Sequence, residues 1–181
     1  MFNEPHFIDE FLSIVKPLNI KTALEVGRLS GELKDALTGI GIDCQGIELN
    51  PTRSDVIKGD FMKHPFTNHY DLVFSSGVLE HYDRLDAQNM ILRMAEIGTY
   101  VLNFVPNRDC TAYMKAKHKT KEPWGSEEPY TVAEIIAPHD FLEPVQPKPW
   151  GYAGYEWSKR FGGDGSQPYL VWCLRRKPCA T

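Results

Sequence analysis

The chain has 181 residues, of which 42% are hydrophobic and 24% charged, a composition typical of a folded globular protein and not of a disordered or fibrous one. Its length predicts a single domain built around one core. The formal net charge of −4 provides no general attraction to phosphate groups, so it disfavours nucleic acid as a partner. The basic segment at residues 115–121 is then either a solvated surface or a local phosphate contact.

Hydrophobic segments and cysteine spacing indicate where in the cell the protein functions. No apolar segment approaches the ~20 residues that a membrane-spanning helix needs, and the first residues lack the pattern of a signal peptide. We therefore expect a cytoplasmic protein. The four cysteines, Cys44, Cys110, Cys173 and Cys179, have no spacing typical of zinc ligands, which predicts reduced thiols and no bound metal.

The first part of the chain alternates helical and strand patterns. Apolar residues recur at helical spacing over residues 7–15, and this helix is expected to end near Pro17. A strand pattern follows over residues 22–26, then a short helix over about residues 30–39. An apolar run at residues 44–48 predicts the next strand.

The same alternation continues to Pro106. Residues 70–75 form a short apolar run that predicts a strand, and residues 84–97 carry a helical apolar face. Residues 99–105 are rich in β-branched and aromatic side chains, so they predict a strand that Pro106 ends. Strands that alternate with helices predict a parallel sheet with right-handed crossovers.

The pattern changes after Pro106. Residues 107–130 are polar and loop-like, and a connection of this length is more typical of a lid or a substrate-binding segment. Thr131 and Glu134 have the spacing of a capping box, which predicts a short helix that ends before Pro138.

Two late strand patterns complete the chain. They cover about residues 143–150 and 169–176, and a loop rich in glycine and aromatic residues joins them at about residues 151–168. Two strands after a helix suggest an antiparallel addition at the edge of the sheet.

The segment of residues 22–31 holds the strongest functional signal. An apolar strand run there contains Glu25 and leads into Gly27 and Gly31, which predicts a tight turn at the carboxyl end of a strand. Two more acidic residues, Glu48 and Asp60, follow later apolar runs. Open α/β sheets bind nucleotides at this edge, so the three acidic residues predict a nucleotide pocket.

This order of features resembles the class I S-adenosylmethionine-dependent methyltransferases, over nearly the whole chain. The resemblance implies a Rossmann-like, doubly wound α/β fold with three layers. Its sheet is mostly parallel and seven-stranded, with an antiparallel last strand. The first motif of that family is acid-x-Gly-x-Gly-x-Gly; Glu25, Gly27 and Gly31 match it, whereas Leu29 stands where the middle glycine is usual.

The resemblance also implies a set of cofactor contacts for S-adenosylmethionine. Glu25 and Gly27 would lie near its amino-acid portion, and Gly31 would open the following helix. Glu48 would accept hydrogen bonds from the ribose hydroxyls. Asp60 would meet the adenine amino group. The remaining predicted contacts are Phe61 beside the adenine, and Ser75 and Ser76 in the turn that lines the sulfonium end.

Methyl transfer requires mainly that an acceptor atom be held near the methyl group. A hydroxyl acceptor would also need a base, and His81, after the fourth strand, is the first candidate, with Glu80 next. The predicted substrate-binding residues are Trp124, Glu127, Glu128 and Tyr130, whose carboxylates and rings could hold a cationic amine or stack a planar acceptor.

These features predict an enzyme that methylates an oxygen or nitrogen of a small molecule. The segment at residues 75–78 differs from the Asn-Pro-Pro-Tyr type of motif, which disfavours methylation of amines in nucleic acid. Two alternatives stay open: a non-catalytic binding or regulatory domain of the same fold, and a nicotinamide-dependent oxidoreductase. The aromatic segment at residues 169–172 is either a sheet edge or the face of a homodimer.

Overall fold

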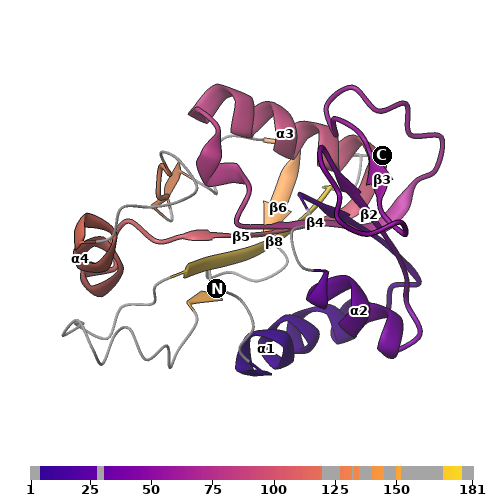
Figure 1. Cartoon of the computed structure of the whole chain (residues 1–181), viewed down its shortest axis with the longest axis horizontal. Helices are drawn as coiled ribbons and strands as arrows, with labels where there is room; N and C mark the ends of the chain where they lie inside the picture. The colour runs from indigo at the N-terminus through magenta and orange to yellow at the C-terminus, as the bar shows by residue number, and fades with distance from the viewer. Residues whose placement is uncertain are drawn as a thin grey trace.

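The computed structural model describes residues 5–27, 31–119, 127–131, 133–134, 140–144, 150–151 and 169–176. One sheet, with strand order β3-β2-β1-β4-β5-β8-β6, runs through the described part of the chain. α1 and α2 lie on one side of this sheet and α3 on the other (Figure 1). The predicted three-layer α/β arrangement is therefore confirmed.

The first half of the sheet is parallel. Its elements are α1 (Pro5–Val15), the one-turn helix η1 (Lys16–Leu18), β1 (Thr22–Val26), α2 (Glu32–Gly39), β2 (Asp43–Glu48) and β3 (Ile57–Lys58). β1 pairs in parallel with both β2 and β4. Because the connections alternate in this way, the carboxyl ends of β1, β2 and β4 meet at one edge of the sheet.

The centre of the sheet continues with β4 (Tyr70–Ser76), the one-turn helix η2 (Leu79–His81), α3 (Arg84–Ile97) and β5 (Gly98–Pro106). α3 begins where the sequence predicts, because the carboxylate of Asp83 accepts the main-chain N–H of Asp86 at 2.8 Å and caps the helix. β5 extends through Pro106, one residue further than expected.

The late strands form the antiparallel part. β8 (Tyr169–Arg176) runs antiparallel to β5 on one side, and β6 (Leu142–Pro144) and β7 (Trp150–Gly151) pair with its other side. β6 and β7 follow one another along β8, so together they occupy the place of one edge strand. This agrees with the predicted seven-stranded order, and it makes β8 an inner strand, so the sheet-edge interpretation of residues 169–172 is wrong.

The polar segment after Pro106 differs from its prediction. Residues 107–130 were expected to be loop-like, yet Thr111–Lys119 forms a helix, α4, beyond the end of β5 (Figure 1). Of the helix predicted after Thr131, Ala133 and Glu134 are helical, and most of the rest lies outside the described residues. The capping box itself is present, since the Thr131 N–H donates to Glu134 Oε2 at 2.7 Å.

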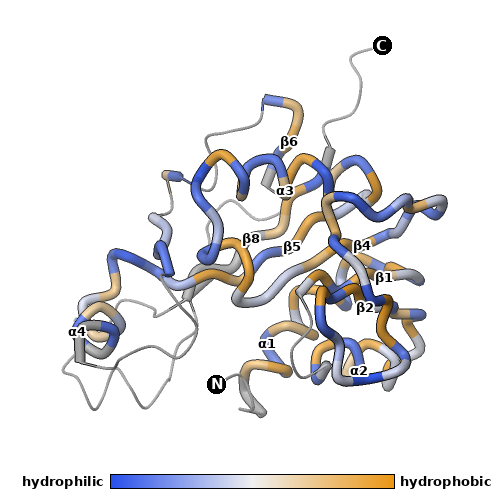
Figure 2. Tube along the Cα trace, turned by 45° about the horizontal axis from the view of Figure 1, so that its top comes forward, coloured by the Kyte–Doolittle hydropathy of each residue, from blue (hydrophilic) through white to orange (hydrophobic). Residues whose placement is uncertain are grey.

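Apolar side chains fill both spaces between the sheet and its helices. On the α1 and α2 side the largest are Phe11, Phe74 and Phe104. On the α3 side, Val73 and Met94 belong to a second cluster. Figure 2 shows the hydrophobic positions along these elements in orange. Alternation along each strand divides its residues between the two clusters, because successive strand side chains point to opposite faces.

Candidate functional site

A cavity of about 430 Å³ opens at the carboxyl ends of β1, β2 and β4. It lies on the α3 side of the sheet, since Val26 and Ile47 from the strands and Met90 from α3 line it and belong to the cluster on that side. Five of its lining residues are predicted site residues: Gly27, Glu48, Asp60, Phe61 and His81. Open parallel sheets commonly bind ligands at this edge.

Gly27 makes the turn at the end of β1. Its φ of +75° lies in the left-handed region, and its N–H donates to the Ile47 carbonyl oxygen at 3.0 Å. A Cβ atom at this position would collide with the side chain of Val78. Glycine is therefore required here both by backbone conformation and by the close approach of the turn after β4. Leu29, the departure from the family motif, lies outside the described residues.

Two carboxylates stand on one wall of the cavity. Glu48 ends β2, is partly buried, and accepts the Asn50 N–H through Oε1 at 3.3 Å. Asp60 follows β3; its Oδ1 accepts the Met62 N–H at 2.9 Å, and its Oδ2 pairs with Lys63 at 3.1 Å. Each oxygen has a further lone pair, so both residues could accept hydrogen bonds from a ligand.

Four of the predicted cofactor residues do not line the cavity. Glu25 is only 6% exposed and points to the other face of β1, because Leu24 and Val26 belong to the cluster on the α3 side. The buried hydroxyl of Ser75 donates to Asn103 Oδ1 at 2.6 Å, which joins β4 to β5.

Ser76 and Gly31 are the other two. The Ser76 hydroxyl is buried and has no hydrogen-bond partner among the described residues. Gly31, at φ +81°, precedes α2, and its carbonyl oxygen accepts the Asp35 N–H at 3.0 Å.

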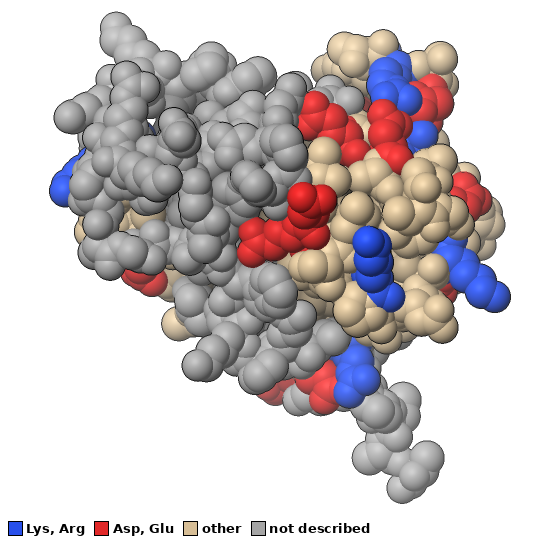
Figure 3. All heavy atoms as spheres, turned by 90° about the horizontal axis from the view of Figure 1, so that it is seen from below, with Lys and Arg blue, Asp and Glu red and all other residues tan. Residues whose placement is uncertain are grey.

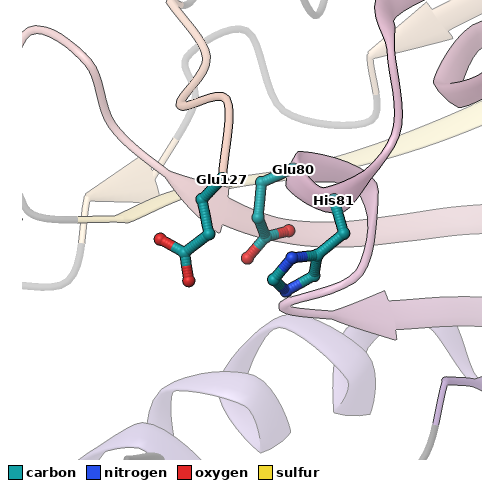
Figure 4. A group of neighbouring side chains, drawn as sticks. All are labelled: Glu80, His81 and Glu127. Carbon is teal, nitrogen blue, oxygen red and sulfur yellow. The ribbon is translucent and has the colours of Figure 1, made fainter. Parts of the chain in front are cut away.

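The predicted catalytic pair, Glu80 and His81, belongs to η2, and Glu127 reaches the same place from the segment after α4. One carboxylate or imidazole atom of each lies within 4.8 Å of the others, and Figure 4 shows the three side chains gathered beside the end of β4. Glu80 is only 3% exposed, and its Oε2 has no hydrogen-bond partner among the described residues. Burial, assisted by the charge of Glu127, raises the pKa of Glu80 to about 8.

Two residues of α4 hold Glu127 in position. The Tyr113 hydroxyl donates to Glu127 Oε2 at 2.6 Å. The Lys117 ammonium lies 3.3 Å from the same oxygen and donates to the main-chain carbonyl of Glu127 at 2.8 Å. Glu127 was predicted as a substrate-binding residue, but no local pattern in the sequence indicated its contacts with Tyr113 and Lys117.

Residues 127–131 cross η2 as a strap, the name used below for this segment. The Tyr130 hydroxyl donates to the Leu79 carbonyl oxygen at 3.2 Å, and the Glu128 N–H donates to that of Glu80 at 2.7 Å. Arg84 donates to the Pro129 carbonyl oxygen at 2.7 Å, and its guanidinium lies 3.7 Å from the centre of the Tyr130 ring. The strap is therefore held against η2 and the start of α3.

The four predicted substrate residues fall in different places. Tyr130 is buried against η2, Glu127 is partly buried and Glu128 is exposed. Trp124 lies outside the described residues, as do residues 152–168, most of the predicted aromatic loop.

Sequence reasoning missed Leu49, Gly59, Tyr82 and Met90 in the cavity wall, whereas Gly77 and Val78 lie in the turn at residues 75–81 that was expected to line the sulfonium end. Gly59 and Leu49 adjoin predicted residues, and Val78 and Tyr82 belong to the same turn as His81. Met90 had no such neighbour, because in the sequence it is one of several apolar residues on the buried face of α3.

The family model described as "25S rRNA (adenine(2142)-N(1))-methyltransferase, Bmt2" matches residues 9–103, slightly more than half of the chain. All of the cavity-lining residues fall inside this range, whereas α4, the strap and β8 lie beyond it. No curated protein matches the chain.

Solved structures resemble the chain over almost its whole length. The magnesium protoporphyrin IX methyltransferase ChlM of Synechocystis PCC 6803, with bound SAH, is 14% identical, with a TM-score of 0.67 over 94% of this chain and 82% of that chain. The N-methyltransferase NodS of Bradyrhizobium japonicum WM9, in complex with S-adenosyl-L-homocysteine, is also 14% identical, with a TM-score of 0.66 over 97% and 90%. An S-adenosylmethionine-dependent methyltransferase from Clostridium acetobutylicum ATCC 824 is 8% identical, with a TM-score of 0.70 over 96% and 92%. At these identities the likeness is one of fold.

Proposed function

Because the chain belongs to the family of the 25S rRNA (adenine(2142)-N(1))-methyltransferase Bmt2, we propose that it transfers a methyl group from S-adenosylmethionine to a base nitrogen of RNA. The observation that carries the proposal is the cavity at the carboxyl ends of β1 and β2, with Glu48 and Asp60 on its wall. Both carboxylates and all other lining residues lie within the part of the chain that matches the family.

The acceptor class corrects an expectation from the sequence. Net charge and the segment at residues 75–78 disfavoured nucleic acid and favoured a small molecule, and this prediction is wrong, since the matching family is described by its action on rRNA. The homodimer expected as an alternative has no support either. A net charge of −4 describes the whole chain and says little about one face, which is why it was a poor guide to the partner.

In this proposal the cofactor lies along the cavity wall. Glu48 accepts hydrogen bonds from the two ribose hydroxyls, because a carboxylate offers two acceptor oxygens to a diol. Asp60 accepts from the adenine amino group, and Phe61 packs beside the ring. The bare backbone at Gly27 lets the amino-acid portion approach the end of β1.

Methylation of a ring nitrogen places modest demands on the protein. The nitrogen lone pair forms the new N–CH₃ bond as the S–CH₃ bond breaks, and SAH leaves as the neutral thioether. No proton need be removed before attack, so positioning supplies most of the acceleration. Of the two residues that the sequence predicted as catalytic, His81 lines the cavity and holds the base rather than deprotonating it, whereas Glu80 is buried and does not line the cavity.

The cofactor site can be tested by calorimetric titration with S-adenosylmethionine and SAH. Glu48→Gln should weaken binding by about tenfold or more, because a hydrogen bond to a charged group contributes about 1.5–3 kcal/mol. Glu96→Gln, at an exposed residue of α3 that pairs with Arg93, is the matched control and should bind like the parent protein. Absence of binding to the parent protein would overturn the assignment of the cavity.

The acceptor can be tested by incubating the protein with RNA and methyl-labelled S-adenosylmethionine. We expect label in RNA, and 1-methyladenosine after digestion to nucleosides and mass spectrometry. Ribonuclease treatment before incubation should abolish incorporation. Label that survives this treatment would contradict an RNA acceptor while leaving the cofactor assignment intact.

A further inference from the structure

Glu80 is a buried carboxylate, and one of its oxygens has no hydrogen-bond partner among the described residues. It is 3% exposed, and the oxygen in question is Oε2. Burying a carboxylate without a partner is costly, so such a group either keeps a proton or meets a positive charge. His81 and Glu127 each place a ligand atom within 4.8 Å of Glu80, and Figure 4 shows the Glu80 carboxylate between them; the charge of Lys117 acts on it as well.

The three side chains have the composition of a cation site. Two carboxylates and an imidazole provide one donor atom each, all within 4.8 Å of one another. Carboxylate oxygens combined with an imidazole nitrogen suit divalent first-row transition metals. The burial of Glu80 at the bottom of the group distinguishes it from an exposed acidic patch.

Glu127 is already oriented for such a role. Tyr113 and Lys117 both contact its Oε2, which fixes the direction of the carboxylate beside Glu80 and His81. Metal-binding carboxylates are commonly held by hydrogen bonds of this kind, which fix their direction. Lys117 lies 3.3 Å from Glu127 Oε2 and offsets the charge of that carboxylate.

We propose that Glu80, His81 and Glu127 bind one divalent cation of the Mn²⁺ or Zn²⁺ type. The spacing of cysteines and histidines predicted no metal, because these ligands come from η2 and the strap, which are far apart in the chain. His81 also lines the cofactor cavity, so the cation lies between that cavity and the strap.

This placement deepens the proposed function and rests on it for the role of the cation. At the acceptor side of the cavity, the cation offers a coordination position to an oxygen or nitrogen of the acceptor. It thereby fixes the distance between the acceptor and the methyl group, while the cofactor itself is held by Glu48 and Asp60.

The test is the binding of Mn²⁺ to the purified full chain, measured by electron paramagnetic resonance of the unbound ion and by calorimetry. We expect one Mn²⁺ per chain. Glu127→Gln and Glu80→Gln should each weaken binding by about tenfold or more, because each removes a charged ligand. Glu128→Gln, which changes the adjacent exposed residue, is the matched control and should leave the Mn²⁺ affinity unchanged.

The fold of each variant is checked by thermal unfolding without Mn²⁺, and SAH is titrated in the same samples. Failure of the parent protein to bind Mn²⁺, or equal losses in Glu127→Gln and Glu128→Gln, would overturn the cation site. If SAH binds and Mn²⁺ does not, only the cation site fails. If Mn²⁺ binds and SAH does not, the proposed function fails instead.

Discussion

At the scale of single residues, the turn at Gly27 imposes the strictest condition on the cavity. Gly27→Ala combines a left-handed backbone, which costs about 1–2 kcal/mol for a residue with a Cβ, with a collision against Val78. We expect a lower free energy of unfolding in urea and a loss of SAH affinity. Because the turn carries part of the cavity wall, the two effects should appear together.

Gly39→Ala provides the matched comparison. Gly39 is the last residue of α2, and a Cβ there would meet nothing within 4 Å. Alanine in a helix is favoured over glycine by roughly 0.5–1 kcal/mol, so this variant should be as stable as the parent or slightly more so. Equal losses in the two variants would contradict the steric argument.

At the scale of elements, α1 is held to the sheet by aromatic packing. Phe11 is fully buried, and its ring centre lies 5.1 Å from that of Phe74 and 5.9 Å from that of Phe104. Phe11→Ala should lower the free energy of unfolding by about 3–5 kcal/mol, measured by urea denaturation. Leu85→Ala, at a leucine of α3 that is 66% exposed, should change it by less than about 0.5 kcal/mol. A small effect of Phe11→Ala would mean that α1 is not part of the cooperative core.

The elements also differ in how readily sequence revealed them. α3 was predicted with its observed ends because an apolar face runs along residues 84–97, and the structure adds the cap at Asp83. α4 was missed because its sequence is rich in basic residues, and its four apolar residues, Ala112, Tyr113, Met114 and Ala116, are too few to form an extended helical pattern. Its buried side is defined by contacts with the strap, which lies beyond any local window.

At the scale of the whole molecule, stability at low pH depends on charges that fasten the end of β5 to the strap. Partial burial raises the pKa of Glu134, but hydrogen bonds from Thr131 and Arg108 outweigh it and lower the pKa to about 2. The unfolded chain therefore binds this proton first, so the stabilisation is present above the ordinary value of about 4.5 and is lost as pH falls towards 2. Glu134→Gln should flatten the dependence of unfolding free energy on pH in this window, measured by urea denaturation. An unchanged slope would contradict the assignment.

Surface charge is distributed rather than gathered on the face that α1 and α2 cover. In Figure 3, acidic and basic atoms alternate over the described part of that face. Arg53 pairs there with Asp35 and Asp55, and Lys34 with Asp55. Such a mixed surface offers no extended attraction to a phosphate backbone. No helix in the described part of the chain is long and apolar enough to cross a membrane.

The sequence by itself determined the alternating elements, the fold class and the acids at the ends of β2 and β3, because these depend on local periodicity and on rules that apply to every parallel sheet. It did not determine which of the predicted residues share a cavity. Glu25 points to the other face of β1 because successive strand side chains alternate, and the Ser75 hydroxyl donates its hydrogen bond to Asn103 instead. The grouping of Glu80 with Glu127 was decided only by tertiary structure, because it depends on α4 and the strap crossing η2, a contact between segments that no spacing in the chain encodes.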